Sequence, residues 1–188
     1  MPKAYVPVQV GAMNLAQRIV MAPMTRFRAD DAHVPLPIVT KYYAQRASVP
    51  GSLIVTEATF ISAAAGGYDN VPGIFNDEQI KMWRHMTDAV HAKRSFIVLQ
   101  LWALGRAADR DVLARDGHQV VSSSAVPISE ESPTPKPLSE VEIQQYIQTY
   151  AQAAKNAIEA GFDAVEIHGA NGYLVDQFLQ DTCNKRTD

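Results

Sequence analysis

The stretch Ala-Val-Glu-Ile-His-Gly-Ala-Asn-Gly-Tyr-Leu at residues 164–174 carries the strongest indication of fold and function in this chain. Its first four residues, apolar except for Glu166, predict a short buried strand. The strand leads directly into His168, Asn171 and Tyr173, and the two glycines between them allow tight turns. A strand that ends in an imidazole, an amide and a phenol is typical of the catalytic rim of a β/α barrel. We therefore place the candidate site here.

Each of these three residues also has a purely structural interpretation. A histidine after a strand is often a hydrogen-bonded structural residue, and an asparagine between glycines is common in turns. A tyrosine before Leu-Val can anchor the helix that follows. These alternatives stay open for each residue taken alone, but the combination favours a site.

Apolar runs and helical patterns alternate along the rest of the chain. A hairpin is predicted from residues 8–10 and 13–15, and strands are predicted at 18–23, 53–56, 96–101 and 164–167. Helices are predicted at 37–47 and 77–93 and, after a Ser-x-x-Glu capping box, from 139 to the glycine at 161. In the last of these, apolar residues recur with helical spacing, at positions 143, 147, 150, 154 and 158. Residues 105–137 are expected to form a long irregular excursion.

Repeated strand–helix units favour a parallel sheet, because parallel neighbours need long crossovers. An open flavodoxin-like sheet would produce the same alternation. A barrel is favoured because chemistry-bearing residues follow every strand: Thr25, then Glu57 with its neighbours, then Gln100 and Trp102, then His168. The fold class expected is therefore α/β of the (β/α)8 TIM-barrel type, with residues 1–188 as a single domain that covers about the first four units.

Composition excludes several classes of protein. The 188 residues are 47% hydrophobic, and 17 Lys and Arg against 20 Asp and Glu give a net charge of −3. No basic stripe indicates nucleic-acid binding, and no long apolar run indicates a membrane span. The first residues lack the apolar core of a signal peptide, and a single cysteine fits a reducing compartment. A cytoplasmic protein without a metal site is expected.

The segment His-Gly-Ala-Asn-Gly-Tyr-Leu at 168–174 resembles the active-site signature of the Old Yellow Enzyme family of FMN-dependent ene-reductases. The resemblance spans essentially the whole chain, including Ala-Pro-Met-Thr-Arg at 22–26, which is similar to a flavin-binding segment of that family. It implies that the flavin is bound by residues from four strand ends, with FMN as the resident cofactor and NAD(P)H as the reductant. The cofactor-binding residues that it implies are Pro23, Met24, Thr25, Ala58, Gln100 and His168.

The same resemblance implies roles in alkene reduction. Hydride from the reduced flavin would attack the β-carbon of an enal or enone, so that negative charge grows on the carbonyl oxygen. His168 and Asn171 resemble the pair of donors to that oxygen, and Tyr173 resembles the acid that protonates the α-carbon. A phenol with its ordinary pKa of about 10 is protonated at neutral pH, as this acid must be. Trp102 resembles a wall of the substrate pocket, although ordinary core packing explains it equally well.

Several motifs narrow the resemblance to one branch of the family. Thr-Arg-Phe-Arg-Ala-Asp at 25–30 and Gly-Arg-Ala-Ala-Asp at 105–109 look like the fungal chanoclavine-aldehyde reductases and isomerases of ergot alkaloid synthesis. A tyrosine at 173 points to the reducing type. The expected substrate is a small unsaturated aldehyde or ketone.

The chain is shorter than the barrels that it resembles. A β/α barrel of this type has eight strands and about 250 residues, whereas four strands are predicted here. The sequence therefore predicts the N-terminal half of such an enzyme, able to pair with a C-terminal half or with itself. The alternative is a catalytically silent half-barrel that serves only as an assembly or interaction module.

Overall fold

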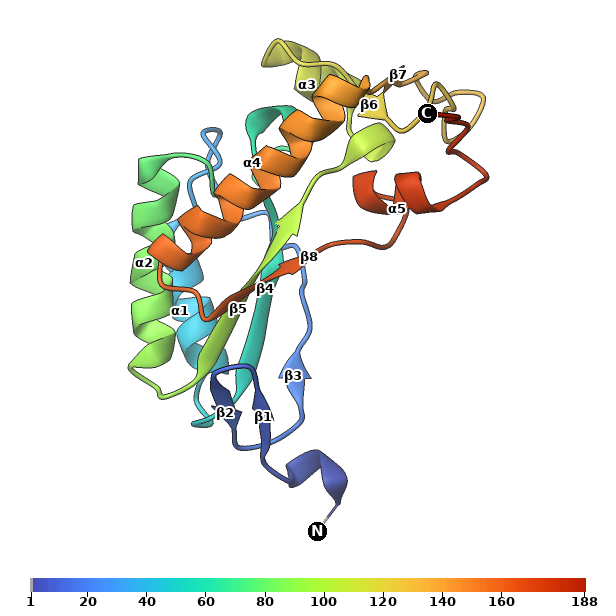
Figure 1. Ribbon diagram of the computed structural model, residues 1–188. Coiled ribbons are helices and arrows are strands. Elements are labelled where there is room, and N and C mark those ends of the chain that lie inside the picture. The colour runs from blue at the N-terminus through green and yellow to red at the C-terminus, as the bar shows by residue number, and fades with distance from the viewer. Residues whose placement is uncertain (1) are drawn as a thin grey trace.

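A computed structural model describes residues 2–188, and its centre is one parallel β-sheet (Figure 1). The four strands lie in the order β3-β4-β5-β8, and every neighbouring pair is parallel. Consecutive strands are therefore neighbours, as in the wall of a barrel. The strands are β3 (Val20–Met21), β4 (Leu53–Phe60), β5 (Phe96–Trp102) and β8 (Ala164–Ile167).

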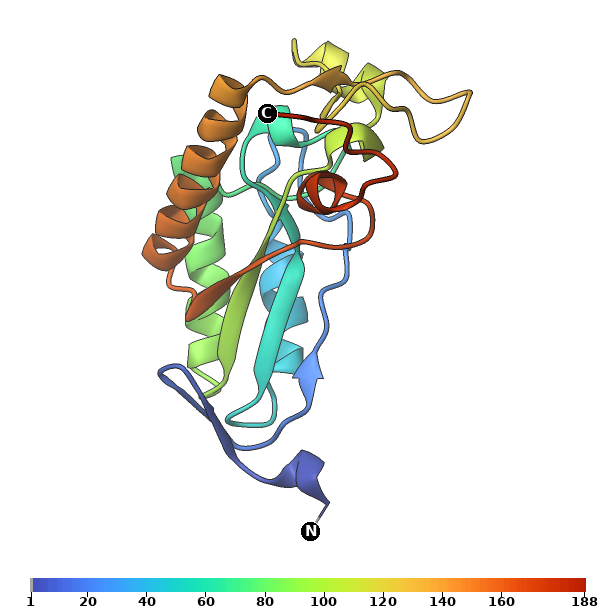
Figure 2. The same cartoon turned by 45° about the vertical axis from the view of Figure 1, so that its right-hand side comes forward.

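Three helices cover one face of this sheet, as the two ribbon views show (Figures 1 and 2). They are α1 (Pro37–Arg46), α2 (Asp77–His91) and α4 (Glu140–Glu159). Pro37 occupies the first turn of α1, while Asn76 and Ser139 form complete capping boxes at the starts of α2 and α4. The predicted helices and the predicted alternation are thereby confirmed.

The remaining elements are short. The predicted hairpin is present as β1 (Val8–Val10) and β2 (Met13–Leu15), and α5 (Leu174–Leu179) follows β8. The others are the turns η1 (Lys3–Tyr5), η2 (Ala63–Ala65) and η3 (Gly105–Ala107), the helix α3 (Arg110–Arg115), and the paired strands β6 (Val121–Ser122) and β7 (Lys136–Pro137).

Three expectations about element boundaries were wrong. The strand predicted at 18–23 is only two residues long, because only Val20 and Met21 pair with β4. The strand predicted at 53–56 continues to Phe60, whose partner is Trp102, the last residue of β5. The excursion at 105–137 is not wholly irregular, since Asp109 caps α3 through hydrogen bonds from two backbone amides and β6 pairs with β7.

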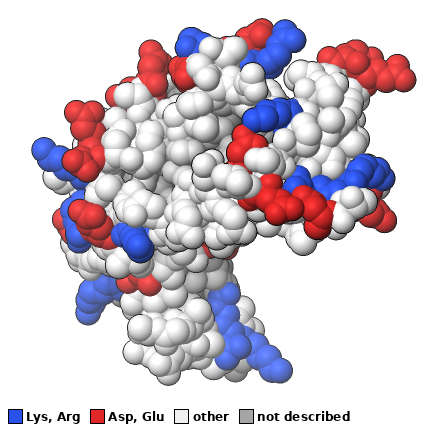
Figure 3. Space-filling model, turned by 45° about the horizontal axis from the view of Figure 1, so that its top comes forward, with Lys and Arg blue, Asp and Glu red and all other residues white. Residues whose placement is uncertain are grey.

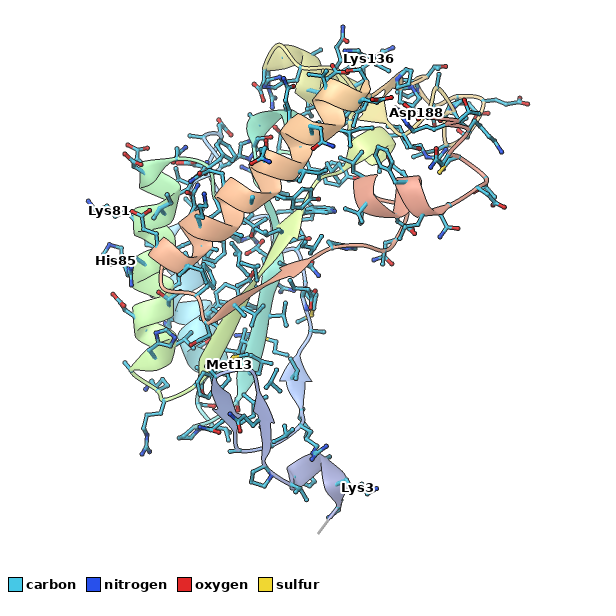
Figure 4. The ribbon with its side chains drawn as sticks, in the orientation of Figure 1. Lys3, Met13, Lys81, His85, Lys136 and Asp188 are labelled. Atoms are coloured by element: carbon cyan, nitrogen blue, oxygen red, sulfur yellow. The ribbon has the colours of Figure 1, made fainter. Side chains whose placement is uncertain are left out.

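The two faces of the sheet are filled differently. On the helical face, Ile54, Ile97 and Leu99 pack against fully buried residues of α2 such as Trp83 and Met86. On the opposite face, Met13 and Leu15 of the hairpin pack on Val55 and Val98. Figure 4 places Met13 at the lower end of the sheet and shows Lys81 and His85 pointing outward from α2. The hairpin thus closes the lower end and leaves the upper end of the inner face for the site.

An irregularity in β4 decides which residues reach that upper inner face. Val55 pairs with Val98, but the next partners are Ala58 and Gln100, so that three residues of β4 advance against two of β5. This bulge reverses the alternation of side chains along β4. It places Ala58 on the inner face, where a regular strand would have placed Glu57.

Candidate active site

The upper ends of the four strands and the loops after them surround one cavity of about 450 Å³. All of the site residues expected from the sequence line it except Met24, which is 44% exposed. Sequence reasoning did not assign four further lining residues, of which Glu166 carries a charge. The lining residues are Pro23, Thr25, Ala58, Gln100, Trp102, Glu166, Ile167, His168, Gly169, Ala170, Asn171 and Tyr173.

His168 is held as a neutral donor. Its backbone amide donates to the carbonyl of Leu101 at 3.0 Å, which continues the pairing of β8 with β5. Its Nδ1 accepts a hydrogen bond from the amide of Ala170 at 3.4 Å, and burial lowers the pKa of the imidazole. With Nδ1 as acceptor, the proton of the neutral ring is assigned to Nε2. The imidazole can therefore donate through Nε2 to a substrate or cofactor atom.

The loop after His168 turns through two left-handed residues. Asn171 has φ of 59° and Gly172 has φ of 74°. Asparagine and glycine tolerate this conformation better than other residues. The carboxylate of Asp176 accepts a hydrogen bond from the amide of Gly172 at 2.8 Å, which ties the turn to α5. Asn171 and Tyr173 are thereby brought to the same cavity as His168.

Three aromatic rings form the wall of the cavity. The imidazole of His168 lies nearly parallel to the indole of Trp102, with an angle of 17° and centroids 6.1 Å apart. The phenol of Tyr173 stands edge-on to the indole, with centroids 4.8 Å apart. The indole Nε1 of Trp102 is buried and has no hydrogen-bond partner within residues 2–188. Trp102 therefore combines core packing on Phe60 with a place at the cavity.

Gln100 is buried at the inner face of β5 and does not lack a partner. Its Nε2 donates to Oε1 of Glu166 on β8 at 2.6 Å. Glu166 and His168 are two residues apart, so the alternation of a strand puts both side chains on one face. That two-residue spacing is the sequence signal that indicates Glu166 as a site residue.

The residues at the cavity suit the ring portion of a flavin. Ala58 presents a small side chain, Gln100 an amide, Thr25 a hydroxyl and Trp102 an unpartnered donor. These are the groups that a flat heterocycle with both donors and acceptors along its edge requires. Among residues 2–188 there is no group of three or more histidine, cysteine or acidic side chains placed to hold a metal ion.

The charge on the surface is mixed. On the face drawn in Figure 3, acidic and basic side chains are interspersed around a broad uncharged area. Within residues 2–188, no helix has both the length and the apolar character needed to cross a membrane.

A sheet of consecutive parallel strands, with donors and aromatic rings gathered at its carboxyl ends, has the arrangement of part of a β/α-barrel enzyme, whose active site lies at that end. Residues 3–188 match the profile of the NADH:flavin oxidoreductase / NADH oxidase family, and the chain belongs to this family. The predicted fold class and the predicted cofactors, FMN and NAD(P)H, agree with this membership.

Similar proteins are about twice as long as this chain. It is 63% identical over its full length to the NADP-dependent oxidoreductase lnbE of Aspergillus flavus and covers 50% of that protein. It is 64% identical over its full length to a chanoclavine-I aldehyde reductase of Penicillium roqueforti and covers 51% of it. It is also 60% identical, over 98% of its length, to a protein of Epichloe festucae var. lolii named a probable inactive reductase, of which it covers 49%.

The structural comparison agrees with the sequence comparisons. The crystal structure of Old Yellow Enzyme from Pichia sp. superposes with a TM-score of 0.96 and 43% sequence identity. The alignment covers 99% of this chain and 50% of that enzyme. The resemblance to the Old Yellow Enzyme family is thus confirmed, and the chain corresponds to about half of such a barrel.

Proposed function

We propose that this chain is the N-terminal half of an FMN-dependent ene-reductase, which reduces the activated C=C bond of an α,β-unsaturated aldehyde or ketone with NAD(P)H. The observation that carries the proposal is the single cavity shared by His168, Asn171 and Tyr173 with Thr25, Ala58 and Gln100. It joins groups suited to a flavin ring with groups suited to an unsaturated carbonyl compound.

The geometry of the cavity supports a separate role for the cofactor and for each of the four side chains. Bound FMN would supply the hydride. The Nε2–H of neutral His168 and the amide of Asn171 would donate to the carbonyl oxygen of the substrate, where negative charge develops. The phenol of Tyr173, edge-on to His168, would protonate the α-carbon. The indole of Trp102 would form a wall of the substrate pocket.

The relatives suggest the substrate class. Two of the similar proteins are named chanoclavine-I aldehyde reductases, at 64% and 54% identity. An unsaturated aldehyde of ergot-type alkaloid synthesis is accordingly the substrate we propose for the complete enzyme. Tyr173 supports reduction as the reaction.

A catalytically silent half-barrel is the second candidate. Several relatives are named probable inactive enzymes, including those of Epichloe festucae var. lolii and Claviceps purpurea. In that case the chain would act as an assembly module while keeping the ancestral residues. The two candidates differ in whether the cavity takes up FMN.

A groove between α4 and α5 supports pairing with a second half. It is lined entirely by apolar surface, and two of its residues, Ile147 and Leu179, are 50% and 71% exposed. The hydroxyl of Tyr150, also in this groove, is buried without a hydrogen-bond partner in residues 2–188. A C-terminal half that packs here would cover the isoleucine and the leucine.

The test is a visible absorption spectrum. The chain is co-expressed with the part of the Penicillium roqueforti reductase that it does not match, and we call this complex the assembled barrel. Bound oxidised FMN is yellow, and its absorbance should fall on addition of NADPH and return on addition of an enal. A complex that forms but stays colourless would exclude the reductase and leave the silent module.

A further inference from the structure

We propose that Glu57 is a positioning residue for the flavin-binding segment at residues 23–26, which it holds through the backbone amide of Arg26. The inference rests on the proposed function, because it concerns how the chain presents Pro23 and Thr25 to the cofactor. Glu57 does not belong to the aromatic wall of the cavity, and the sequence pattern gave it no role in binding the flavin.

The contact itself is direct. Oε2 of Glu57 accepts a hydrogen bond from the amide of Arg26 at 2.9 Å. Arg26 follows Thr25, so this hydrogen bond fixes the peptide unit that joins the two residues. The side chains of Thr25 and Pro23 line the cavity, whereas the segment forms no ladder hydrogen bonds beyond Met21 in β3. After β3 ends at Met21, the carboxylate thus holds the segment in place of strand pairing.

The backbone of Glu57 is itself fixed on several sides. Its amide donates to the hydroxyl of Tyr43 on α1 at 2.9 Å. Its carbonyl accepts hydrogen bonds from the hydroxyls of Thr56 and Thr59 at 2.9 and 3.0 Å. These contacts lie within the bulge of β4 that turns Ala58 toward the cavity. One local structure therefore places Ala58 and holds Thr25, and Glu57 connects the two.

A position as buried as residue 57 is usually occupied by a side chain without charge. Glu57 is 1% exposed, and burial of a carboxylate without a full salt bridge is costly. Burial raises its pKa to about 7, while the Arg26 amide, the charges of Arg26 and Arg28 and the phenol of Tyr43 act in the opposite direction. The carboxyl therefore changes charge near neutral pH. An ionised acceptor forms a stronger hydrogen bond than a neutral one, so Arg26 is held more firmly above pH 7.

The experiment measures the affinity of the assembled barrel for FMN by quenching of flavin fluorescence at pH 6 and pH 8. The matched variants are E57Q, which keeps an acceptor of the same size without charge, and E78Q, which makes the same change at an exposed position of α2. FMN has its own titrating phosphate, and E78Q shares that effect. For each protein the ratio of the FMN affinity at pH 8 to that at pH 6 is compared. This ratio should be about fivefold larger for the unchanged protein and for E78Q than for E57Q.

A second readout does not depend on flavin. The assembled barrel is made with ¹⁵N-arginine, and the amide signal of Arg26, assigned by its absence in R26K, is followed against pH. It should titrate with a midpoint near 7 in the unchanged protein and stay constant in E57Q. The variant E57D has a shorter side chain, whose carboxylate cannot reach the amide of Arg26. The Arg26 signal should therefore not titrate in E57D.

Two outcomes would overturn the proposal. One is an Arg26 amide that does not respond to pH between 6 and 8. The other is an Arg26 amide that titrates while FMN affinity shows the same pH dependence in E57Q and E78Q. Failure of every variant to bind FMN would instead refute the proposed function, and the Arg26 signal would still report whether Glu57 holds the segment.

Discussion

The rings of His168 and Tyr173 meet edge to face, with centroids 4.9 Å apart and planes at 86°. This arrangement separates the two donors in space, since the imidazole and the phenol present their protons from perpendicular planes. An enone needs such a separation, because its carbonyl oxygen and its α-carbon are different atoms of one flat molecule. The pair can therefore serve one substrate in two roles.

Replacement of Tyr173 by phenylalanine tests the acid role. In the assembled barrel, Y173F should slow alkene reduction by about 10²- to 10⁴-fold, the usual contribution of a positioned acid. Reduction of the flavin by NADPH should be nearly unchanged, because that step takes no proton from the phenol. Stopped-flow absorbance separates the two half-reactions. An unchanged oxidative half-reaction in Y173F would contradict the role.

The two donors to the carbonyl oxygen are tested with phenolate ligands, which mimic the developing charge. H168A and a change at Asn171 should each weaken ligand binding, and the double variant should lose less than the sum because both donors serve one acceptor. Asn171 has φ of 59°, so alanine there would add backbone strain of about 1–2 kcal/mol. N171G removes the amide without that strain and is the better variant. Charge-transfer absorbance gives the affinities, and strictly additive losses would indicate two separate sites.

The sequence predicted the elements of the fold because its local signals were strong. Asn76 and Ser139 cap their helices as expected, and the runs at 96–101 and 164–167 became strands of the sheet. The prediction that 164–167 is buried was wrong, because β8 is an edge strand on which Glu166 and Ile167 are exposed. The spacing within 168–174 also grouped the right residues, since His168, Asn171 and Tyr173 line one cavity. Their catalytic roles remain predictions.

What the sequence could not predict depends on contacts between distant segments. The bulge that turns Ala58 inward and Glu57 away is set by register against β5, and no residue pattern within β4 indicates it. The hydrogen bond from Gln100 to Glu166 joins residues 66 positions apart. The helical stripe at 143–158 was read correctly as a helix, but Ile147 and Ile158 are 50% and 56% exposed because only part of the stripe faces the sheet.

Glu57 should also make stability depend on pH. Its pKa is raised from 4.5 to about 7 in the folded state, so the folded protein binds the proton more tightly than the unfolded chain. Stability contributed by the protonated form is complete below pH 4.5 and is lost as pH rises through 7. Between pH 5 and pH 8 the loss should be roughly 2–3 kcal/mol, since each pKa unit corresponds to about 1.4 kcal/mol.

The variant E57Q has no carboxyl to ionise and should lack this component. Thermal midpoints of the assembled barrel and of E57Q, measured at pH 5 and pH 8, give the comparison, and the groups common to both cancel. The thermal midpoint of E57Q should therefore increase relative to the thermal midpoint of the unchanged protein as pH rises from 5 to 8. Parallel pH profiles for the two proteins would show that Glu57 does not titrate in this range.

The last prediction is that the chain by itself associates through its open side and does not hold FMN tightly. Ile147 and Leu179 lie in the apolar groove between α4 and α5, and Ile167 at the end of edge strand β8 is 56% exposed. An uncovered side chain of this size forgoes about 1.5–3 kcal/mol of burial, and an open strand edge offers unpaired backbone groups. Net stability of a domain is only about 5–15 kcal/mol, so several such residues matter. The ring contacts that we propose for Thr25, Ala58, Gln100 and His168 would form only one part of a flavin site, so FMN binding by the lone chain should be weak.

Two matched variants locate the surface responsible. I147E puts a charge into the groove and should weaken pairing with the C-terminal half by about 100-fold or more, because burial of an unpaired charge costs several kcal/mol. I128E places the same charge on an isoleucine that is 57% exposed in the 105–137 excursion, outside the groove, and should leave pairing unchanged. Analytical ultracentrifugation measures the association, and absorbance near 450 nm measures bound flavin. If the lone chain sediments as a sharp monomer with stoichiometric FMN, the prediction is refuted. If I147E and I128E affect pairing equally, the interface does not lie at the groove between α4 and α5.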